Sequence, residues 1–212
     1  MIESGSHIQG IDPAAFGPLP HGAMRWEKPE ASLEGLIGDY FIFDSEGPDS
    51  IGSVEWMLPN WPVLRFVLAE NPMTIEGPDW RWSPLPEAGF YGPTSRVLKH
   101  KSDGGGTVGV SLTPAGVARL FDIDVSDYRD RMVPLPDLLP EGCAELVTEL
   151  RTSARGLEVK SIFDRFFLER MQRPHRAEPQ IVALNRLLLD ENVQTVGEIA
   201  RTLDLPVHSL AR

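Results

Sequence analysis

The sequence predicts an α+β protein in which a β-barrel or sandwich comes first, a helical linker follows and a partial helix-turn-helix comes last. Glycine and proline, nineteen of each, crowd residues 10–110 and become rare after about residue 140. Short runs of aromatic and β-branched residues lie between these breaks, whereas apolar residues recur every three or four positions in the later part. The first pattern is typical of strands joined by turns, and the second of amphipathic helices.

The first half of the chain holds six runs that we expect to form strands. Each run is short, rich in apolar or aromatic residues, and bounded by residues that favour turns. Short strands at this spacing favour a sandwich or a small barrel. The runs are residues 40–43, 54–58, 63–68, 80–82, 97–98 and 107–112.

A helix is expected directly after the last of these strands. Thr113 can cap its first turn, and Pro114 suits that turn because the missing N–H would have no partner there anyway. Val117, Leu120 and Phe121 would form the buried stripe of this helix.

Two further amphipathic helices are expected over about 138–171, after a short turn at 126–128. Their apolar residues recur at intervals of three and four, with a break at Gly156. Such a hairpin suits the core of its own chain and a dimer interface equally well. The recurring residues are Leu139, Cys143, Leu146, Val147 and Leu150 in the first helix, and Val159, Ile162, Phe163, Phe166, Phe167 and Met171 in the second.

The end of the chain has the pattern of a helix-turn-helix whose second helix has only begun at Arg212. A polar linker broken by Pro174 precedes a helix with Ile181, Leu184, Leu187 and Leu188, and residues 196–212 follow. Thr195 and Glu198 can form a capping box, and Asp204 stands at the turn, where unusual backbone angles are needed. Ile199, Ala200 and Leu203 would form one apolar face, joined in the same small core by Leu205, Val207 and Leu210. An ordinary helical hairpin with no role in DNA binding gives the same pattern.

The charge of the chain argues against DNA binding by these residues alone. The formal net charge is -11, and affinity for DNA comes largely from Lys and Arg that neutralise phosphates. Residues 177–212 follow the same trend, with five acids against three bases. Any basic reading surface is therefore expected beyond Arg212, with His208, Ser209 and Arg212 as partial DNA-binding residues of a longer protein.

The remaining composition gives no sign of a membrane, disulfide or cofactor protein. A single cysteine, Cys143, rules out an internal disulfide and fits a reducing compartment, so a cytoplasmic location is expected. No run approaches the roughly 18 apolar residues of a membrane helix, and the N-terminus lacks a secretory signal, so no membrane partner is expected.

Catalytic and metal-binding patterns are also missing from the sequence. The five histidines are scattered, there is no Gly-x-Ser-x-Gly elbow, and Cys143 falls on an apolar helical stripe where thiols are usually inert. The three glycines 104–106 lack the Lys-Ser/Thr of a phosphate loop and are expected to form a hairpin turn. We therefore expect no metal, no cofactor and no enzymatic activity.

A small-molecule pocket is the functional site that the β region favours. Such pockets combine apolar and aromatic walls with one or two charged groups, often at the mouth of a barrel. Arg65 is a charged residue in an otherwise apolar strand. The alternative is that the aromatic residues fill the core and Arg65 pairs with an acid at the sheet surface. The pocket candidates are Trp56, Arg65, Trp80, Trp82 and Phe90.

The order of several short motifs resembles that of AraC-family transcription regulators, in particular those with a cupin-like N-terminal domain that occurs in many bacterial genomes. The motifs are the aromatic run 40–44, Leu58-Pro-Asn60 followed by the run 63–68, the turn 90–96 with Ser95 in place of Thr, the strand-to-helix junction 109–116, and the segment 131–137. In two respects the chain departs from the family: Pro59-Asn-Trp-Pro62 replaces the usual Pro-Asp-Gly, and only the start of one of two helix-turn-helix units is present.

The resemblance implies a cupin-like sensor domain over 1–135, a helical linker or dimerisation element over 136–175, and the start of the helix-turn-helix over 176–212. Its implied function is effector sensing by a regulator that binds DNA through a module beyond Arg212, with an unidentified small molecule as ligand and a homodimer as a possible assembly. One alternative is a stand-alone small-molecule-binding or cupin-like enzyme domain, which predicts turnover or a bound metal. Another is a module that acts by dimerisation alone, which predicts a stable dimer without a ligand response.

Overall fold

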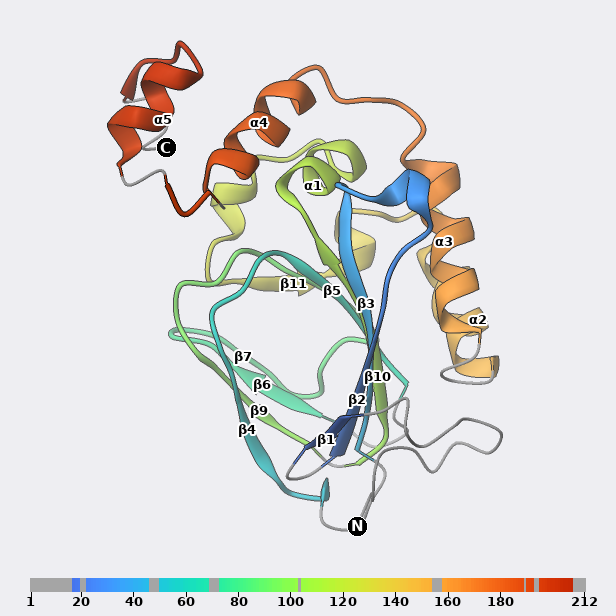
Figure 1. Cartoon of the computed structure of the whole chain (residues 1–212). Helices are drawn as coiled ribbons and strands as arrows, with labels where there is room; N and C mark the ends of the chain where they lie inside the picture. Colours follow the sequence, from blue (N-terminus) through green and yellow to red (C-terminus); the bar gives the residue numbers. More distant parts are fainter. Residues whose placement is uncertain are drawn as a thin grey trace.

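The computed structural model has the expected α+β architecture, with two antiparallel sheets facing each other in the N-terminal part and helices packed around them (Figure 1). The structure describes residues 17–19, 22–45, 50–68, 73–102, 104–153, 158–188, 190–192 and 195–207. The predicted fold class, a β-sandwich followed by helices, is confirmed.

The larger sheet has seven strands, in the order β1-β2-β3-β10-β5-β8-β11. At its centre β10 pairs antiparallel with both β3 and β5, so that Val110 lies opposite Tyr40 on one side and Leu64 on the other. The strands are β1 (Gly17–Leu19), β2 (Gly22–Glu27), β3 (Ile37–Asp44), β5 (Val63–Val67), β8 (Ala88–Tyr91), β10 (Gly106–Leu112) and β11 (Met132–Pro134).

The smaller sheet has four strands, in the order β4-β9-β6-β7, and faces the larger one (Figure 1). Its apolar side packs against Phe41, Val63 and Tyr91 of the larger sheet, which forms a core between the two layers. The strands are β4 (Val54–Met57), β6 (Thr74–Glu76), β7 (Arg81–Trp82) and β9 (Leu98–Lys101).

All six runs that we expected to form strands contain strand residues, but five strands were not expected. The run 97–98 marks only the beginning of β9, which continues through the polar residues His100 and Lys101. The missed strands β1, β2, β6, β8 and β11 have at most six residues each, and three of them contain glycine, which has little strand propensity. Pairing with neighbouring strands therefore decides their structure, and that information is absent from a local window of sequence.

The five α-helices of the described residues begin where their caps allow. The helix α1 (Pro114–Leu120) is capped by Thr113, whose hydroxyl accepts a hydrogen bond from the Gly116 amide at 3.1 Å. The first predicted linker helix begins at Cys143 and not near residue 138, because Pro140 and the left-handed Gly142 (φ +74°) precede it. The other helices are α2 (Cys143–Thr152), α3 (Val159–Arg170), α4 (Glu178–Leu188) and α5 (Val196–Thr202).

The main core lies between the larger sheet and the helices α2 and α3. The ring of Phe163 on α3 lies 5.1 Å from that of Tyr40 and 5.5 Å from that of Phe66, measured between ring centres. The Tyr40 hydroxyl donates a hydrogen bond to Asp164 Oδ1 at 2.8 Å. The apolar stripe of residues 143–171 therefore packs within its own chain, which is one of the two alternatives that the sequence left open.

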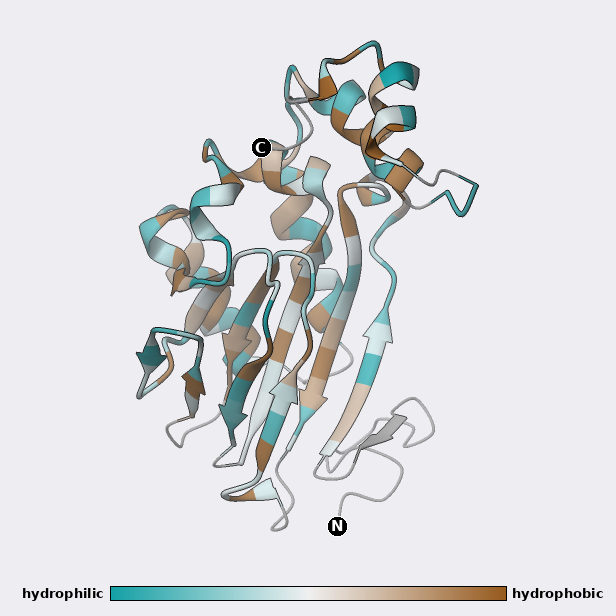
Figure 2. Ribbon diagram, turned by 90° about the vertical axis from the view of Figure 1, so that its left-hand side faces the viewer, coloured by the Kyte–Doolittle hydropathy of each residue, from teal (hydrophilic) through white to brown (hydrophobic). Residues whose placement is uncertain are grey.

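Successive residues of the larger sheet point alternately to the two cores. Tyr40, Leu64 and Phe66 face the helices, whereas Phe41 and Val63 face the smaller sheet. Because both faces are covered, hydrophobic residues follow one another along the central strands, as the hydropathy colours of Figure 2 show. This alternation decides which side chains can reach the space between the sheets.

The start of the helix-turn-helix pattern forms as expected at α5. Thr195 and Glu198 form a capping box, Ile199 and Ala200 are buried, and Asp204 adopts a positive φ of 51°. The expectation for Val207 was wrong: its side chain is 56 % exposed, although the Leu205 amide two residues earlier still bonds to the Ala200 carbonyl. Leu210 lies outside the described residues.

Gly116 in the first turn of α1 gives a test of this packing. A Cβ added there would lie 1.9 Å from the Leu36 carbonyl oxygen, which belongs to the backbone and cannot easily yield. We expect Gly116→Ala to lower the free energy of unfolding by about 1–3 kcal/mol or more, measured by urea denaturation. The control is Gly197→Ala in α5, where the nearest atom would be 3.9 Å away and the change should be neutral or stabilise by up to about 1 kcal/mol. Equal destabilisation by both substitutions would contradict this account.

Candidate ligand-binding site

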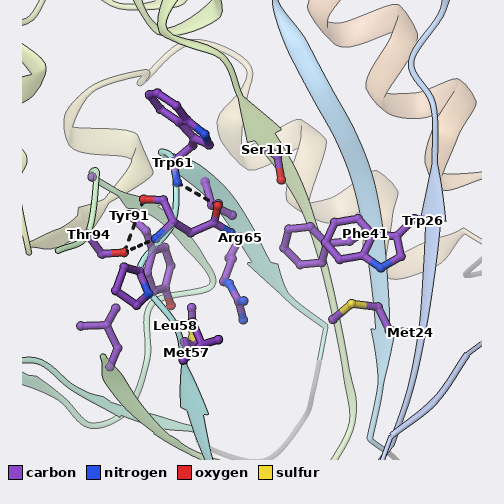
Figure 3. A pocket seen from close by; sticks show the side chains of 15 residues that line it. Met24, Trp26, Phe41, Met57, Leu58, Trp61, Arg65, Tyr91, Thr94 and Ser111 are labelled. Atoms are coloured by element: carbon purple, nitrogen blue, oxygen red, sulfur yellow. Dashed lines mark hydrogen bonds between the residues drawn. The ribbon is translucent and has the colours of Figure 1, made fainter. Parts of the chain in front are cut away.

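An apolar cavity of about 510 Å³ lies between the two sheets and opens to solvent beside the loop 58–62 (Figure 3). Its volume falls in the range of pockets that bind small molecules. The larger sheet supplies one wall and the strand β4 with the following loop supplies the other. The lining residues include Met24, Trp26, Phe41, Met57, Leu58, Asn60, Trp61, Val63, Arg65, Tyr91, Thr94, Leu98 and Ser111.

Arg65 lies at the base of this cavity because of its register in the larger sheet. It faces the same side as Val63, toward the smaller sheet, and its partners on the neighbouring strands are Gly109 and Gly89. A Cβ at Gly109 would lie 2.1 Å from the Phe41 ring, and one at Gly89 would lie 3.2 Å from the Tyr91 ring. The two glycines thus leave the space that the Arg65 guanidinium and the two rings occupy.

The guanidinium of Arg65 contacts two aromatic rings, and Glu55 is the acid that acts on its charge. Its central carbon lies 5.2 Å from the centre of the Phe41 ring and 5.5 Å from that of Tyr91 (Figure 3). The Arg65 Nε is buried, and neither a hydrogen bond nor an ion pair to Arg65 occurs among the described residues. Our alternative expectation placed Arg65 at the sheet surface, paired with an acid; in the structure Arg65 lines the cavity, and the nearby Glu55 favours its charged form.

Burial is the main influence on the charges at this site. It lowers the pKa of Arg65, although the nearby Tyr91 and Glu55 act in the opposite direction. The guanidinium nevertheless stays charged at neutral pH because its ordinary pKa is so high. Burial also raises the pKa of Tyr91 to about 12, with the Arg65 charge opposing that shift. The Tyr91 hydroxyl is therefore protonated, and it too is buried without a partner among the described residues.

The rim of the cavity is apolar, and ring contacts and hydrogen bonds hold it in place. Trp26 and Leu58 are 54 % and 73 % exposed, and the Trp26 ring lies against that of Phe41 with 5.6 Å between centres. The loop is tied to the next turn of chain, since the Asn60 amide donates to Thr94 Oγ1 at 2.8 Å and the Thr94 amide donates to the Asn60 carbonyl at 3.0 Å. This loop is the segment in which the sequence departs from the AraC-family pattern.

The structure brings only Arg65, of the five pocket candidates, to the wall of this cavity. Trp56 is 61 % exposed, because its neighbour Met57 takes the inward position on β4. Trp80 and Trp82 pack beside the core between the sheets and donate indole hydrogen bonds to the carbonyl oxygens of Asp130 at 2.6 Å and Met132 at 3.3 Å. Phe90 is fully buried on the helix side, with its ring 5.1 Å from that of Phe121.

Sequence reasoning missed Phe41 and Tyr91, the two aromatic residues that contact Arg65. Each lies next to an aromatic residue that the sequence analysis noted, Tyr40 and Phe90, but faces the opposite side of the sheet. Side chains alternate along a strand, so this pattern could have separated the residues that face the helices from those that face the cavity, once one face of the sheet had been identified. The predicted DNA-binding residues His208, Ser209 and Arg212 lie outside the described residues.

Neither a metal cluster nor a membrane helix is found in the part of the chain that the structure describes. No group of three or more His, Cys, Asp and Glu residues there could hold a metal ion. No helix there is both long enough and apolar enough to cross a membrane.

His100 lies near Arg65 and should make stability depend on pH. Burial, assisted by the positive charge of Arg65, lowers the pKa of His100 to about 4 from an ordinary value of 6.5. In the unfolded chain His100 takes up a proton below about pH 6.5, whereas in the folded chain it stays neutral to about pH 4. Folding is therefore expected to lose roughly 3 kcal/mol of stability through this group as the pH falls across that window.

His100→Gln tests this assignment, because it removes the titrating group and keeps a polar side chain. Urea denaturation of both proteins at several pH values between 7 and 4 should show a shallower loss of stability in the variant. Other groups titrate equally in both proteins and cancel in the difference. Parallel pH profiles would show that His100 does not titrate as described.

Comparisons with solved structures show a distant likeness. No protein-family model matches the chain, and no curated protein sequence matches it. Among solved structures it is similar to "the AraC-like transcriptional activator CuxR", with a TM-score of 0.36 and 12 % sequence identity over 90 % of this chain and 79 % of that chain. A likeness this distant carries no functional argument, so the site itself must support any function.

Proposed function

We propose that this chain is the effector-sensing part of a cytoplasmic, DNA-binding transcription regulator of the AraC type, and that the cavity between its sheets binds the effector. The observation that carries the proposal is an apolar cavity at whose base lies Arg65, with its Nε buried and without a hydrogen-bond partner among the described residues. Burying an N–H group without a hydrogen bond costs folding free energy, so its presence at a cavity favours a binding role. The ordered sequence motifs and the capping box at Thr195 and Glu198 support the regulator assignment.

The route from this cavity to the terminal helices runs through Trp61. Trp61 lines the cavity and also a neighbouring apolar groove of about 530 Å³, whose other walls include Val117 of α1 and Ile181 and Leu184 of α4. A ligand that moves the 58–62 loop would therefore change the surface on which α4 rests. Such coupling requires that the ligand bind two conformations with different affinity.

The helix α4 packs at the surface of the fold, which suits an element that moves. None of its described side chains is fully buried. Arg119 of α1 is paired with Glu178 of α4, and its Nε donates to Glu178 Oε2 at 2.8 Å. Arg119 also donates to the Met171 carbonyl at 2.8 Å, which joins α1 to the end of α3. An element without fully buried side chains opens more readily than one built into a core.

Ligand binding can be measured on this 212-residue chain by thermal unfolding and tryptophan fluorescence across a broad panel of metabolites. At least one class of compound should raise the melting temperature and change the fluorescence, because Trp26 and Trp61 lie at the cavity. Trp61→Ala should weaken the response to that class. The matched control, Trp56→Ala, should preserve it because Trp56 is exposed and does not line the cavity. Unchanged stability and fluorescence across the whole panel would contradict the proposal.

The regulator assignment makes a separate prediction about the gene. The reading frame should continue beyond the codon for Arg212 with the rest of the second helix, a long connecting helix and a second, Arg- and Lys-rich helix-turn-helix. This basic module is expected because the present chain carries a net charge of -11, and affinity for DNA comes largely from Lys and Arg that neutralise phosphates. A stop codon directly after Arg212 would instead favour a stand-alone binding domain.

A further inference from the structure

We propose that the cavity takes a small organic anion, a molecule with an apolar body and one carboxylate or sulfonate group, and that Arg65 and Tyr91 bind the anionic group. The inference rests on the proposed function in one respect, that the cavity is a ligand site. It goes further by naming the chemical class of the ligand and the two side chains that recognise it.

Arg65 supplies the positive charge that such a ligand needs. It is the one charged side chain among the described residues of the cavity wall, and its Nε is buried without a hydrogen-bond partner. The rings of Phe41 and Tyr91 contact the guanidinium, and Glu55 is near enough to favour its charged form. A carboxylate or sulfonate can accept two parallel hydrogen bonds from a guanidinium and neutralise its charge.

Tyr91 supplies a second donor on the same side of the sheet. Val63 faces Tyr91 across the β5–β8 pair, and Arg65 faces Gly89 two residues along, so both functional side chains point into the cavity (Figure 3). The Tyr91 hydroxyl has no hydrogen-bond partner among the described residues. Burial keeps the Tyr91 pKa high, at about 12, so the hydroxyl retains its proton and can donate a hydrogen bond to an anion.

The rest of the cavity suits an apolar body and disfavours other ligand classes. Met24, Trp26, Leu58 and Leu98 offer hydrocarbon and aromatic surface. Polar groups are few, and the main chain of Asn60 is already bonded to Thr94, so a sugar would lose hydrogen bonds to water without replacing them. A cation would be repelled by Arg65. The net charge of -11 does not exclude an anion, since charges more than about 8–10 Å from the cavity are screened by salt.

Two fluorescent probes of nearly equal shape test the proposal on the 212-residue chain. Anilinonaphthalene sulfonate carries an aromatic body and one anionic group, whereas N-phenylnaphthylamine has the same body without the charge. Wild-type protein should bind the sulfonate at least about tenfold more tightly, as expected for hydrogen bonds to a charged partner. Titration of probe fluorescence gives both dissociation constants.

Substitutions then assign the preference to the named side chains. Arg65→Met, which keeps an apolar stem, should abolish the preference for the sulfonate while N-phenylnaphthylamine still binds. Tyr91→Phe should weaken sulfonate binding about threefold to tenfold and leave the neutral probe unaffected. The matched control, Arg96→Met, changes an exposed arginine that does not line the cavity and should leave both constants unchanged. A cooperative thermal transition verifies that each variant is folded. If Arg65→Met does not fold, the effect of Tyr91→Phe on sulfonate binding decides the test.

The outcomes separate failure of the ligand class from failure of the proposed function. Equal affinity of wild-type protein for both probes, or an undiminished preference in Arg65→Met and Tyr91→Phe, would overturn the anion assignment and leave a cavity that binds apolar molecules. Binding of neither probe would contradict the anion assignment and also count against a ligand-binding cavity. Selective, Arg65-dependent binding of the sulfonate would support both.

Discussion

The antiparallel pairing of β10 with β3 and β5 is the constraint on which the rest of the structure depends. Because side chains alternate along paired strands, this register sends Tyr40, Leu64 and Phe66 to the helical core and Phe41 and Arg65 to the space between the sheets. A slip of one residue would exchange the two sets and bury Arg65 among the aromatic rings below α3. The fold and the candidate site therefore have a common cause.

The candidate site also shows how a binding residue can be kept at the expense of stability. Gly89 and Gly109 flank Arg65 and lower strand propensity and packing, and the Arg65 Nε is buried without a hydrogen-bond partner among the described residues. The helical core offsets these costs, since it packs the rings of Phe163, Phe66 and Tyr40 at 5.1 and 5.5 Å. A protein under selection for stability alone would place an apolar residue at position 65.

Sequence reasoning was sufficient where the deciding contacts are local. The caps at Thr113 and Thr195 and the left-handed Asp204 follow from neighbours within a few residues, and the structure confirms them. It was insufficient for β6, β8 and β11, which have three or four residues each and depend on partner strands. For the same reason the aromatic residues could not be divided between core and cavity, so Arg65 was recognised as a pocket residue whereas Tyr91 was missed.

The arrangement of the helices indicates which of them a ligand could influence. The helices α2 and α3 contribute many fully buried side chains to the main core, so displacing them would disrupt the fold. The helix α4 has no fully buried described side chain and is attached through Arg119 and the groove that Trp61 shares with the cavity. A movement of Trp61 would therefore displace α4 more easily than α2 or α3, and α4 is also the helix that leads to α5. In this geometry the proposed ligand would shift α4 through Trp61 while the core formed by the larger sheet, α2 and α3 stays in place.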